Sequence, residues 1–590
     1  MTAPHIQSGL DDRYLLEDGL VHLTGIHALV RLPLDQRRAD RVMINERVCE
    51  GCGDCGRKSN CLSVQPVPTE FGRKTQIDQS SCNLDFSCLE SDRPSFLTVI
   101  PGRPGRGAAR RVAPPLDAAA IPAPAAPDPA AAARGPHVTR IADVGGTGVV
   151  TLSQILSTAA MLAGRQVRAL DQTGLAQKGG AVISDVKIGG TDPDVASKAA
   201  AGECDLYLGC DLLVAADARN LAAADPAWTV AVVSTSEVPT GTMIVDTSAS
   251  FPPSAEITGR IRRRTRGDGI FLDARRLAGT LLGEDQFANI LLTGVAFQAG
   301  ALPLPADAIE QAVRLNGVKV DANLQAFRRG RQAVADPEAL AAAVADLWAP
   351  AAAGRPRAAQ AQGAEGQAQT LASAVAAPAG SVLARIVALR AADLIAYQDA
   401  LYARRYVDLV ERVRAVEAER VPAASELAEA VARYLYKLMA YKDEYEVARL
   451  SLDPAVDARA RSRISYRLHP PLLRALGARK KITLGPWFAP VFGVLVRMRR
   501  LRGTRLDPFG HTTVRRAERQ LIAEYTRLIG DLLAGLSAGN HALAVELASL
   551  PDEVRGYEQV KLDNVARYRE RLTALRAEFA GQASVTARES

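Results

Sequence analysis

The sequence has no long apolar run. No stretch of about 18 uninterrupted apolar residues occurs, and no charged segment followed by an apolar run opens the chain, so nothing indicates a membrane-spanning helix or a secretory signal. We therefore expect a cytoplasmic protein without membrane contact. Aromatic residues make up only 5% of the chain and hydrophobic residues 48%, a composition typical of a helix-rich globular protein rather than a disordered one.

Long runs of like charge are missing too. The formal net charge is +7, and the densest basic cluster, around Arg262–Arg266, is no longer than an ordinary solvated surface. We therefore predict no nucleic-acid partner. A basic face also suits the docking of an acidic electron carrier, because complementary charge raises the rate of encounter.

Cysteine is scarce outside one segment. Six of the eight cysteines lie between Cys49 and Cys88. In a reducing compartment this concentration indicates a metal site rather than a set of disulfides. The other two, Cys204 and Cys210, lie in an apolar run with period-two burial, where cysteine acts as a small hydrophobic residue.

The chain length suggests three or four domains, at about 150 residues each. Two stretches rich in Ala, Pro and Gly separate segments of different character, and such stretches are typical of extended linkers. The predicted order is an N-terminal segment (1–40), a cysteine-rich segment (41–102), an Ala/Pro linker (103–137), an α/β domain (138–335), a second linker (350–380) and a helical C-terminal domain (381–590).

The predicted fold class is α/β plus α. In the α/β domain, short apolar strands such as Leu206–Leu208 and Val230–Val233 alternate with helical patterns such as Leu152–Ala163, which is typical of βαβ units and a parallel sheet. In the C-terminal domain, apolar residues recur at helical spacing, and core packing is the simplest explanation for them. The amphipathic helices predicted there are Leu394–Ala415, Leu427–Tyr441 and Arg515–Leu533.

The strongest chemical signal is the run Cys49-x2-Cys52-x2-Cys55. Thiolates at this spacing surround one corner of an iron–sulfur cluster, and Gly51 and Gly53 allow backbone amides to approach and hydrogen-bond sulfur. Zinc is the main alternative, but four-cysteine zinc sites normally use two separate C-x2-C pairs, so we favour iron–sulfur. The predicted ligands of a [4Fe-4S] cluster are Cys49, Cys52, Cys55, Cys61, Cys82 and Cys88.

A glycine-rich stretch with Gly145, Gly146 and Gly148 follows an apolar strand and precedes a helix, a place where backbone amides bind phosphate. Its spacing is not G-x-G-x-x-G, and Asp143 would put a negative charge near a pyrophosphate, so we do not predict a nicotinamide cofactor. Gly267-Asp268-Gly269 together with the later Asn289 imitates a thiamine-diphosphate magnesium motif, but the family's spacing between the two is several residues longer. We predict a simple turn there.

Four stretches of the cysteine-rich segment resemble the iron–sulfur segment of indolepyruvate:ferredoxin oxidoreductases. The stretches are Val48–Cys55, Ser59–Val64, Thr69–Lys74 and Ser80–Asn83. Where that family commonly has a further cysteine, this chain has Arg93. Six thiolates suffice for one cluster and fall short of the eight that two would use, so the resemblance implies one [4Fe-4S] cluster and leaves a second open.

The α/β domain resembles the gamma-type domain of pyruvate and indolepyruvate ferredoxin oxidoreductases, in the same order of motifs. The motifs are Val144–Val150, Asp171–Gly180, Gly209–Leu212 and Val238–Gly241. This resemblance implies contacts with coenzyme A or with a partner subunit. The residues expected to make these contacts are Gly145, Gly146, Gly148, Gln177, Lys178 and Thr240.

The ends of the chain resemble the long single-chain members of the indolepyruvate family, through residues 11–34 and 436–446. In those chains thiamine-diphosphate domains follow the first of these segments, whereas here the cysteines follow within a few residues of Arg41. The resemblance implies an oxidoreductase component that carries electrons from a 2-oxo acid, with an aryl group, to ferredoxin. Thiamine diphosphate and Mg²⁺ would then belong to a partner subunit.

Two other interpretations stay open. In the first, the protein is a stand-alone iron–sulfur electron carrier whose βαβ domain binds a nucleotide. In the second, it is an inactive remnant of an internally deleted gene, which the junction near Arg41 and the presence of Arg93 would explain.

Overall fold

The computed structural model describes residues 41–91, 94–100, 112–127, 130, 134–174, 179–190, 196–247, 249–348, 359–453, 463–468 and 482–589. They fall into two compact units: unit 1 joins the segments up to 59 and 64–103 to residues 354 onward, and unit 2 combines 60–63 with 104–353. The predicted N-terminal segment 1–40 lies outside the described residues. Within the described ranges, no helix has the length and apolar character needed to cross a membrane.

Unit 2 is built on a six-stranded sheet of order β10-β9-β8-β5-β7-β6. The strands are β5 (His137–Val144), β6 (Val167–Thr173), β7 (Ala181–Ile188), β8 (Leu206–Gly209), β9 (Val230–Ser234) and β10 (Ile270–Leu272). β10, β9, β8 and β5 are parallel, whereas β7 is antiparallel to both β5 and β6. The prediction of a parallel sheet is therefore wrong for β7, because the connection from β6 is too short for the crossover that parallel strands need.

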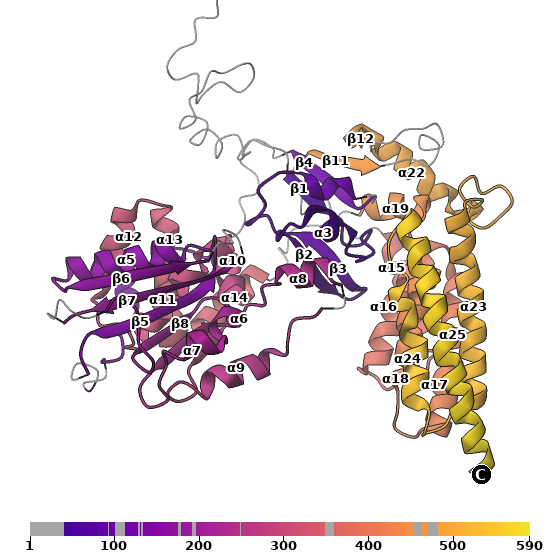
Figure 1. Ribbon diagram of the computed structural model, residues 1–590. Coiled ribbons are helices and arrows are strands. Elements are labelled where there is room, and N and C mark those ends of the chain that lie inside the picture. The colour runs from indigo at the N-terminus through magenta and orange to yellow at the C-terminus, as the bar shows by residue number, and fades with distance from the viewer. Residues whose placement is uncertain are drawn as a thin grey trace, which may run out of the picture. The chain divides into compact units, whose positions relative to one another are not determined.

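Helices cover both faces of this sheet (Figure 1). The helices of unit 2 are α5 (Val149–Leu162), α6 (Leu212–Ala215), α7 (Ala218–Leu221), α8 (Gly241–Val245), α9 (Ser254–Arg262), α10 (Ala274–Leu282), α11 (Ala288–Gln298), α12 (Ala306–Asn316), α13 (Val320–Ala335) and α14 (Pro337–Trp348). Alternate strand residues enter two cores: Leu208 packs with α5 and α11, while its neighbour Tyr207 packs with α6 and α9. Period-two alternation thus divides the strands between two apolar layers.

Two glycines let α11 and α13 approach closely. A Cβ atom at Gly294 would lie 2.0 Å from the Phe327 carbonyl oxygen, and one at Gly330 would lie 1.9 Å from the Leu291 carbonyl oxygen. No larger residue fits at either position without separating the helices. This crossing holds one side of the unit 2 core together.

The Ala/Pro segment predicted as a linker is held along unit 2 over residues 112–127. The Ala113 amide donates to the Leu281 carbonyl at 2.8 Å. The Gln298 side-chain amide donates to the Pro122 carbonyl at 3.0 Å, and Arg329 donates to the Pro114 carbonyl. Proline has no N–H, but its carbonyl accepts, so these contacts fix the segment to α11 and α13.

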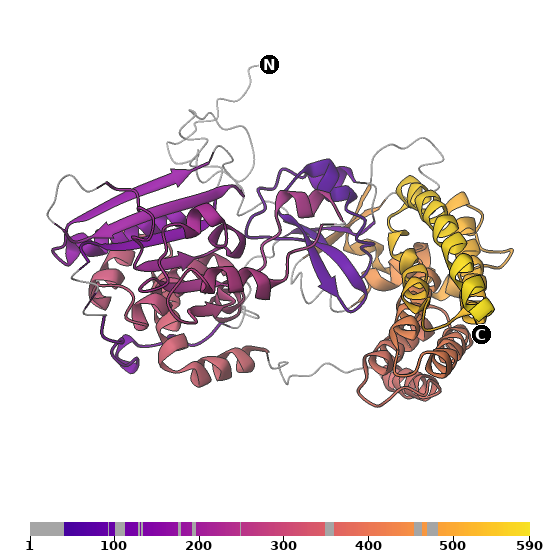
Figure 2. The same cartoon turned by 60° about the horizontal axis from the view of Figure 1, so that its bottom comes forward.

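Unit 1 contains two small antiparallel sheets. A hairpin pairs β2 (Val64–Thr69) with β3 (Gly72–Ile77), and it is the indigo pair of arrows in Figures 1 and 2. The four-stranded sheet has the order β1 (Arg41–Ile44), β4 (Phe96–Ile100), β11 (Arg463–Leu468), β12 (Ile482–Leu484). Because β4 pairs with β11, the predicted cysteine-rich segment and the predicted C-terminal domain form one unit.

The rest of unit 1 is helical. Its helices are α3 (Asp54–Ser59), η1 (Ser87–Glu90), α15 (Ala359–Ala372), α16 (Val382–Tyr397), α17 (Ala400–Arg420), α18 (Glu426–Met439), α19 (Glu444–Ser451), α22 (Ala489–Met498), α23 (Thr513–Gly535), α24 (His541–Ser549) and α25 (Glu558–Glu589). The segment 350–380 predicted as a linker includes α15, and Leu371 and Val375 are buried in the helical core. An Ala-rich composition is compatible with a helix as well as with a linker. Here, packing against the helical core stabilises the helix.

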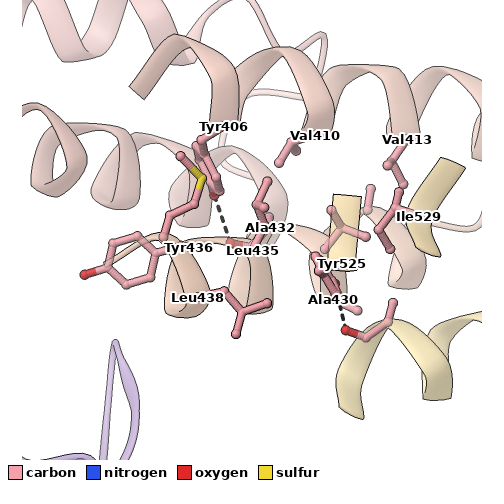
Figure 3. Packing of buried hydrophobic residues seen from close by; sticks show 14 of the residues in the cluster. Tyr406, Val410, Val413, Ala430, Ala432, Leu435, Tyr436, Leu438, Tyr525 and Ile529 are labelled. Carbon is pink, nitrogen blue, oxygen red and sulfur yellow. Dashed lines mark hydrogen bonds between the residues drawn. The ribbon is translucent and has the colours of Figure 1, made fainter. Parts of the chain in front are cut away.

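The helical core of unit 1 is shown in Figure 3. Val410 and Val413 of α17, Leu435 of α18 and Ile529 of α23 are buried there. Two buried tyrosines satisfy their hydroxyls within the core, since Tyr406 donates to the Ala432 carbonyl at 3.0 Å and Tyr525 to the Ala548 carbonyl at 2.7 Å. Each bond removes the cost of burying a phenol without a partner.

One predicted helix is divided in two. The apolar pattern over Leu394–Ala415 predicts a continuous helix, but α16 ends at Tyr397 and α17 begins at Ala400. The Asp399 side chain accepts the Tyr402 amide at 2.8 Å and so caps the start of α17. A capping aspartate between two apolar stretches was the signal for this boundary.

Candidate metal centre and glycine-rich loop

Three of the predicted ligands share one tight loop that leads into α3. Cys49 and Cys55 are completely buried and Cys52 is 7% exposed. Gly51 and Gly53 take positive φ angles of 64° and 73°, which only glycine adopts without strain. The Gly51 amide donates to Cys49 Sγ at 3.3 Å. The loop therefore aims backbone N–H at sulfur, an arrangement suited to a thiolate that ligates iron.

Two more of the predicted ligands lie in the same unit. Cys88 is buried on η1, which packs beside α3, and Lys58 of α3 donates to the Glu90 carbonyl at 3.5 Å. Cys82 is partly buried in the loop before η1. Cys61 lies in the segment 60–63, which belongs to unit 2, and Arg93 lies outside the described residues.

Three successive carbonyls of the cysteine loop receive hydrogen bonds from distant parts of unit 1. Tyr557 donates to the Val48 carbonyl at 2.5 Å, Lys74 to the Cys49 carbonyl at 2.8 Å, and Arg555 to the Glu50 carbonyl at 3.2 Å. These donors come from β3 and from the residues around the start of α25. Sequence reasoning missed Arg555 and Tyr557, because no local pattern marks them.

Glu50, inside the loop, is buried among lysines. Burial acts to raise the pKa of Glu50, but the charges of Lys561, Lys74 and Lys442 outweigh it, and the pKa lies below its usual value. Burial lowers the pKa of Lys74 to about 8, although Glu50 opposes the change. Lys561 Nζ also pairs with Glu518 at 2.6 Å. The loop thus has charged neighbours in a setting with little solvent to screen them.

Among the described residues, one trio of possible metal ligands has all of its ligand atoms within 4.8 Å of one another, namely Glu417, Glu426 and His541. This trio has a structural explanation. The buried Glu417 carboxylate accepts the amides of Leu427 and Ala428, both at 2.8 Å, in the first turn of α18. His541 Nε2 lies 2.7 Å from the same carboxylate. Glu417 therefore caps α18, as an acceptor at a helix N-terminus does.

The second candidate site is the glycine-rich loop between β5 and α5. Gly146 and Gly148 have positive φ angles, and a Cβ atom at either would meet nothing within 4 Å. The Gly145 amide donates to the Gly180 carbonyl at 2.6 Å. The loop is thus anchored at Gly145 and open at the other two glycines, next to the start of α5, where amides favour an anion.

A buried carboxyl group holds this loop in place. Asp143 accepts hydrogen bonds from the Thr147 hydroxyl at 2.6 Å and from Asn289 at 2.8 Å. Burial raises the pKa of Asp143 to about 6, although these hydrogen bonds oppose the change. Asn289, predicted to have no magnesium role, ties α11 to the loop. Gly267-Asp268 forms a turn between α9 and β10, as predicted.

One other predicted contact, Thr240, lies at the same edge of the sheet. Thr240 follows β9 and caps the short helix α8, and parallel strands β5 and β9 both end at this edge. The Leu62 side chain would be 2.3 Å from a Cβ atom at Gly179 and 3.8 Å from one at Gly241, so segment 60–63 packs there. Gln177 and Lys178 lie outside the described residues.

Cys204 and Cys210 are buried in unit 2. Burial raises the pKa of both thiols above the ordinary value. Thiols that stay protonated are poor metal ligands and poor nucleophiles. Their positions fit the packing role predicted for them.

Comparisons with known proteins bear on unit 2. Residues 138–333 match the family model described as pyruvate ferredoxin/flavodoxin oxidoreductase. The indolepyruvate oxidoreductase subunit IorB of Pyrococcus horikoshii is 29% identical over 196 residues, which are 33% of this chain and 93% of that protein. IorB of Archaeoglobus fulgidus is 28% identical over 198 residues, 32% of this chain and 91% of that protein. Through residues 138–333, unit 2 is a domain of the 2-oxoacid:ferredoxin oxidoreductase family. The family comprises oxidoreductases, and the mixed α/β fold of unit 2 agrees with the predicted fold class.

One further family model and two solved structures also match this chain. Residues 383–574, in unit 1, match a family of unknown function, DUF6537. Pyruvate oxidoreductase subunit PORC of Thermotoga maritima, a solved structure, is 21% identical, with coverage of 34% of this chain and 96% of that chain and a TM-score of 0.25. The 2-oxoglutarate:ferredoxin oxidoreductase of Magnetococcus marinus is 17% identical, with coverage of 40% and 37% and a TM-score of 0.25.

Proposed function

We propose that this chain is the electron-transferring component of an indolepyruvate-type 2-oxoacid:ferredoxin oxidoreductase. The observation that carries the proposal is the cysteine loop, with three buried thiols and the Gly51 amide directed at Cys49 Sγ. When bound there, an iron–sulfur cluster accepts and releases electrons one at a time. Cys49, Cys52 and Cys55 would hold it, with a fourth ligand from Cys61, Cys82 or Cys88.

The conformation and the surroundings of this loop are fixed by other residues of the protein. Left-handed Gly51 and Gly53 form the tight turn, and burial excludes water from Cys49 and Cys55. Donors from β3 and from the start of α25 fix the loop carbonyls. Such fixed hydrogen bonds and restricted solvent access are the means by which a protein sets a cluster's reduction potential.

The decarboxylation would occur on a partner subunit that binds thiamine diphosphate and Mg²⁺, with an aryl 2-oxo acid as substrate and ferredoxin as acceptor. Two observations support a partner: the relatives named IorB are called subunits, and the positions of a Cβ atom at Gly146 and Gly148, beside the start of α5, have no neighbour within 4 Å. We propose coenzyme A or the partner chain as the occupant of the space beside these two glycines, with Thr240 at the same edge of the sheet.

The proposal is tested by counting iron and acid-labile sulfide in the full chain purified without oxygen. We expect about four iron atoms per chain and an EPR signal after reduction. Replacement Cys52→Ala should abolish both, whereas Cys210→Ala, in unit 2, should leave both unchanged. Wild-type protein without iron would refute the proposal and favour the inactive remnant.

A second measurement separates the component from a stand-alone carrier. The iron-loaded chain is mixed with a thiamine-diphosphate-binding 2-oxoacid oxidoreductase subunit, and reduction of a dye is followed with indolepyruvate and coenzyme A. We expect reduction only when both proteins are present. Tight binding of a nucleotide by the isolated chain, without activity in the mixture, would instead favour the carrier.

A further inference from the structure

We propose that the helical C-terminal part of the chain, whose family match has no known function, supplies one wall of the iron–sulfur site. The inference rests on the proposed function, since it assigns a role toward the cluster in the Cys49–Cys55 loop. The wall is the segment Arg555-Gly556-Tyr557 together with Lys561, at the beginning of α25. It would both shield the cluster and favour its reduced state.

The first argument is packing against a predicted ligand. A Cβ atom at Gly556 would lie 3.1 Å from Cys52 Sγ and 2.8 Å from a methyl group of Val560. Gly556 also has a φ angle of 102°, which glycine adopts most easily. The backbone of this turn therefore lies directly on the sulfur, at a position where a side chain would displace it.

The second argument is the pair of bonds that flank this contact. Tyr557, directly after Gly556, donates to the Val48 carbonyl, and Arg555, directly before it, donates to the Glu50 carbonyl and to the Arg73 carbonyl at 3.1 Å. One turn of the C-terminal part is thus hydrogen-bonded to the loop on both sides of Cys49. Residues about 500 positions apart in sequence join here, so the contact is a tertiary one rather than local capping.

The third argument is charge. Lys561 is 5% exposed. Its amide donates to the Tyr557 carbonyl at 3.3 Å, and its Nζ lies 6.0 Å from the centre of the Tyr557 ring, whose hydroxyl contacts the cysteine loop. A cluster gains one negative charge on reduction, and a nearby cation stabilises that state, more strongly where little water screens it. Lys561 would therefore raise the reduction potential. Its partner Glu518 keeps a second ion pair with Arg515 at 2.7 Å, so removal of Lys561 does not leave Glu518 unpaired.

The shielding is tested with Gly556→Ala in the full chain purified without oxygen. Gly503 has a φ angle of 74° and open space around it, so Gly503→Ala is a control with similar backbone strain and no sulfur contact. We expect Gly556→Ala to lose most of its iron or to bleach in air several times faster than the wild type, and the control to match the wild type. Equal iron content and an equal bleaching rate in both variants would refute the proposal that the turn at Gly556 shields the cluster. Tyr557→Phe, which removes one hydroxyl, gives the same comparison if Gly556→Ala does not fold.

The charge effect is tested by EPR-monitored redox titration of Lys561→Met. We expect a midpoint potential more negative than that of the wild type, with unchanged iron content. Arg576→Met, at an exposed ion pair with Asp531, is the control and should leave the potential unchanged. An unchanged potential in Lys561→Met would refute the charge effect. Wild-type protein that carries no iron would refute the proposed function itself, a result distinct from either variant outcome.

Discussion

The two glycine-containing loops of this chain differ in what surrounds them. In unit 1, a Cβ atom at Gly51 would lie 2.2 Å from the Arg73 carbonyl oxygen and 2.8 Å from an Arg555 nitrogen, whereas in unit 2 Gly146 and Gly148 have nothing within 4 Å. The first loop is closed by other parts of its own unit, and the second is open on one side. The difference agrees with the two proposals, a cluster enclosed by the chain at the cysteine loop and an external ligand at the glycine-rich loop.

The largest expected effect comes from filling the closed loop. Gly51→Ala would place a methyl group on the Arg73 carbonyl and force alanine to a φ angle of 64°, and overpacking with strain costs about 2–5 kcal/mol together. We expect loss of iron and a lower urea midpoint for unit 1. Gly72→Ala, with a φ angle of 86° in open space, is the matched control. If both variants lost iron equally, strain rather than closure would be the cause.

A pH effect should mark the loop of unit 2. The raised pKa of Asp143, about 6, means that the folded state binds a proton more tightly than the unfolded state, so this stabilisation is full below pH 4 and is lost as the pH rises through 6. We expect the wild type to lose about 3 kcal/mol relative to Asp143→Asn between pH 4 and pH 7. Urea unfolding of both proteins across this range measures the difference, and a constant difference would refute the assignment.

A slightly smaller effect should come from the charge that anchors the closed loop. Asp393 accepts from Arg47 at 2.7 Å, from Arg449 at 2.9 Å and from Tyr436 at 2.5 Å. Burial acts to raise the pKa of Asp393, but Arg449 and Arg47 hold it well below the usual value. Asp393→Asn should therefore cost unit 1 about 2–3 kcal/mol at neutral pH.

The same anchor gives a pH test of opposite sign. A carboxyl group with a depressed pKa contributes stability above the unfolded pKa, near 4, and loses it as the pH falls. The cost of Asp393→Asn, measured by urea unfolding, should therefore shrink below about pH 4. A cost that did not change with pH would mean that lost packing, not lost charge, weakens unit 1.

The smallest effect is expected in the open loop. Gly146→Ala forces alanine to a φ angle of 90° but meets no neighbour, so the cost should be backbone strain alone, about 1–2 kcal/mol. Iron content should not change, because the substitution lies in unit 2. A loss of iron in this variant would refute the claim that the glycine-rich loop is independent of the iron site.

Much of the architecture could be predicted from local patterns. Alternating apolar residues predicted β8 and β9, and helical spacing predicted α18 and α23 to within a few residues. Three errors share a cause. The antiparallel strand β7, the helix α15 and the break before α17 all depend on signals that periodicity does not carry, namely connection length, packing and a capping side chain.

The candidate metal centre, too, could be predicted from the sequence only in part. The sequence by itself determined the thiols at Cys49, Cys52 and Cys55 and the glycines between them, because a short loop is governed by residue type and spacing. Only the tertiary structure decided what encloses that loop. Arg555, Gly556 and Tyr557 come from about 500 residues away, and hydrogen bonds and close contacts over that separation depend on how helices and strands pack, which no local pattern specifies.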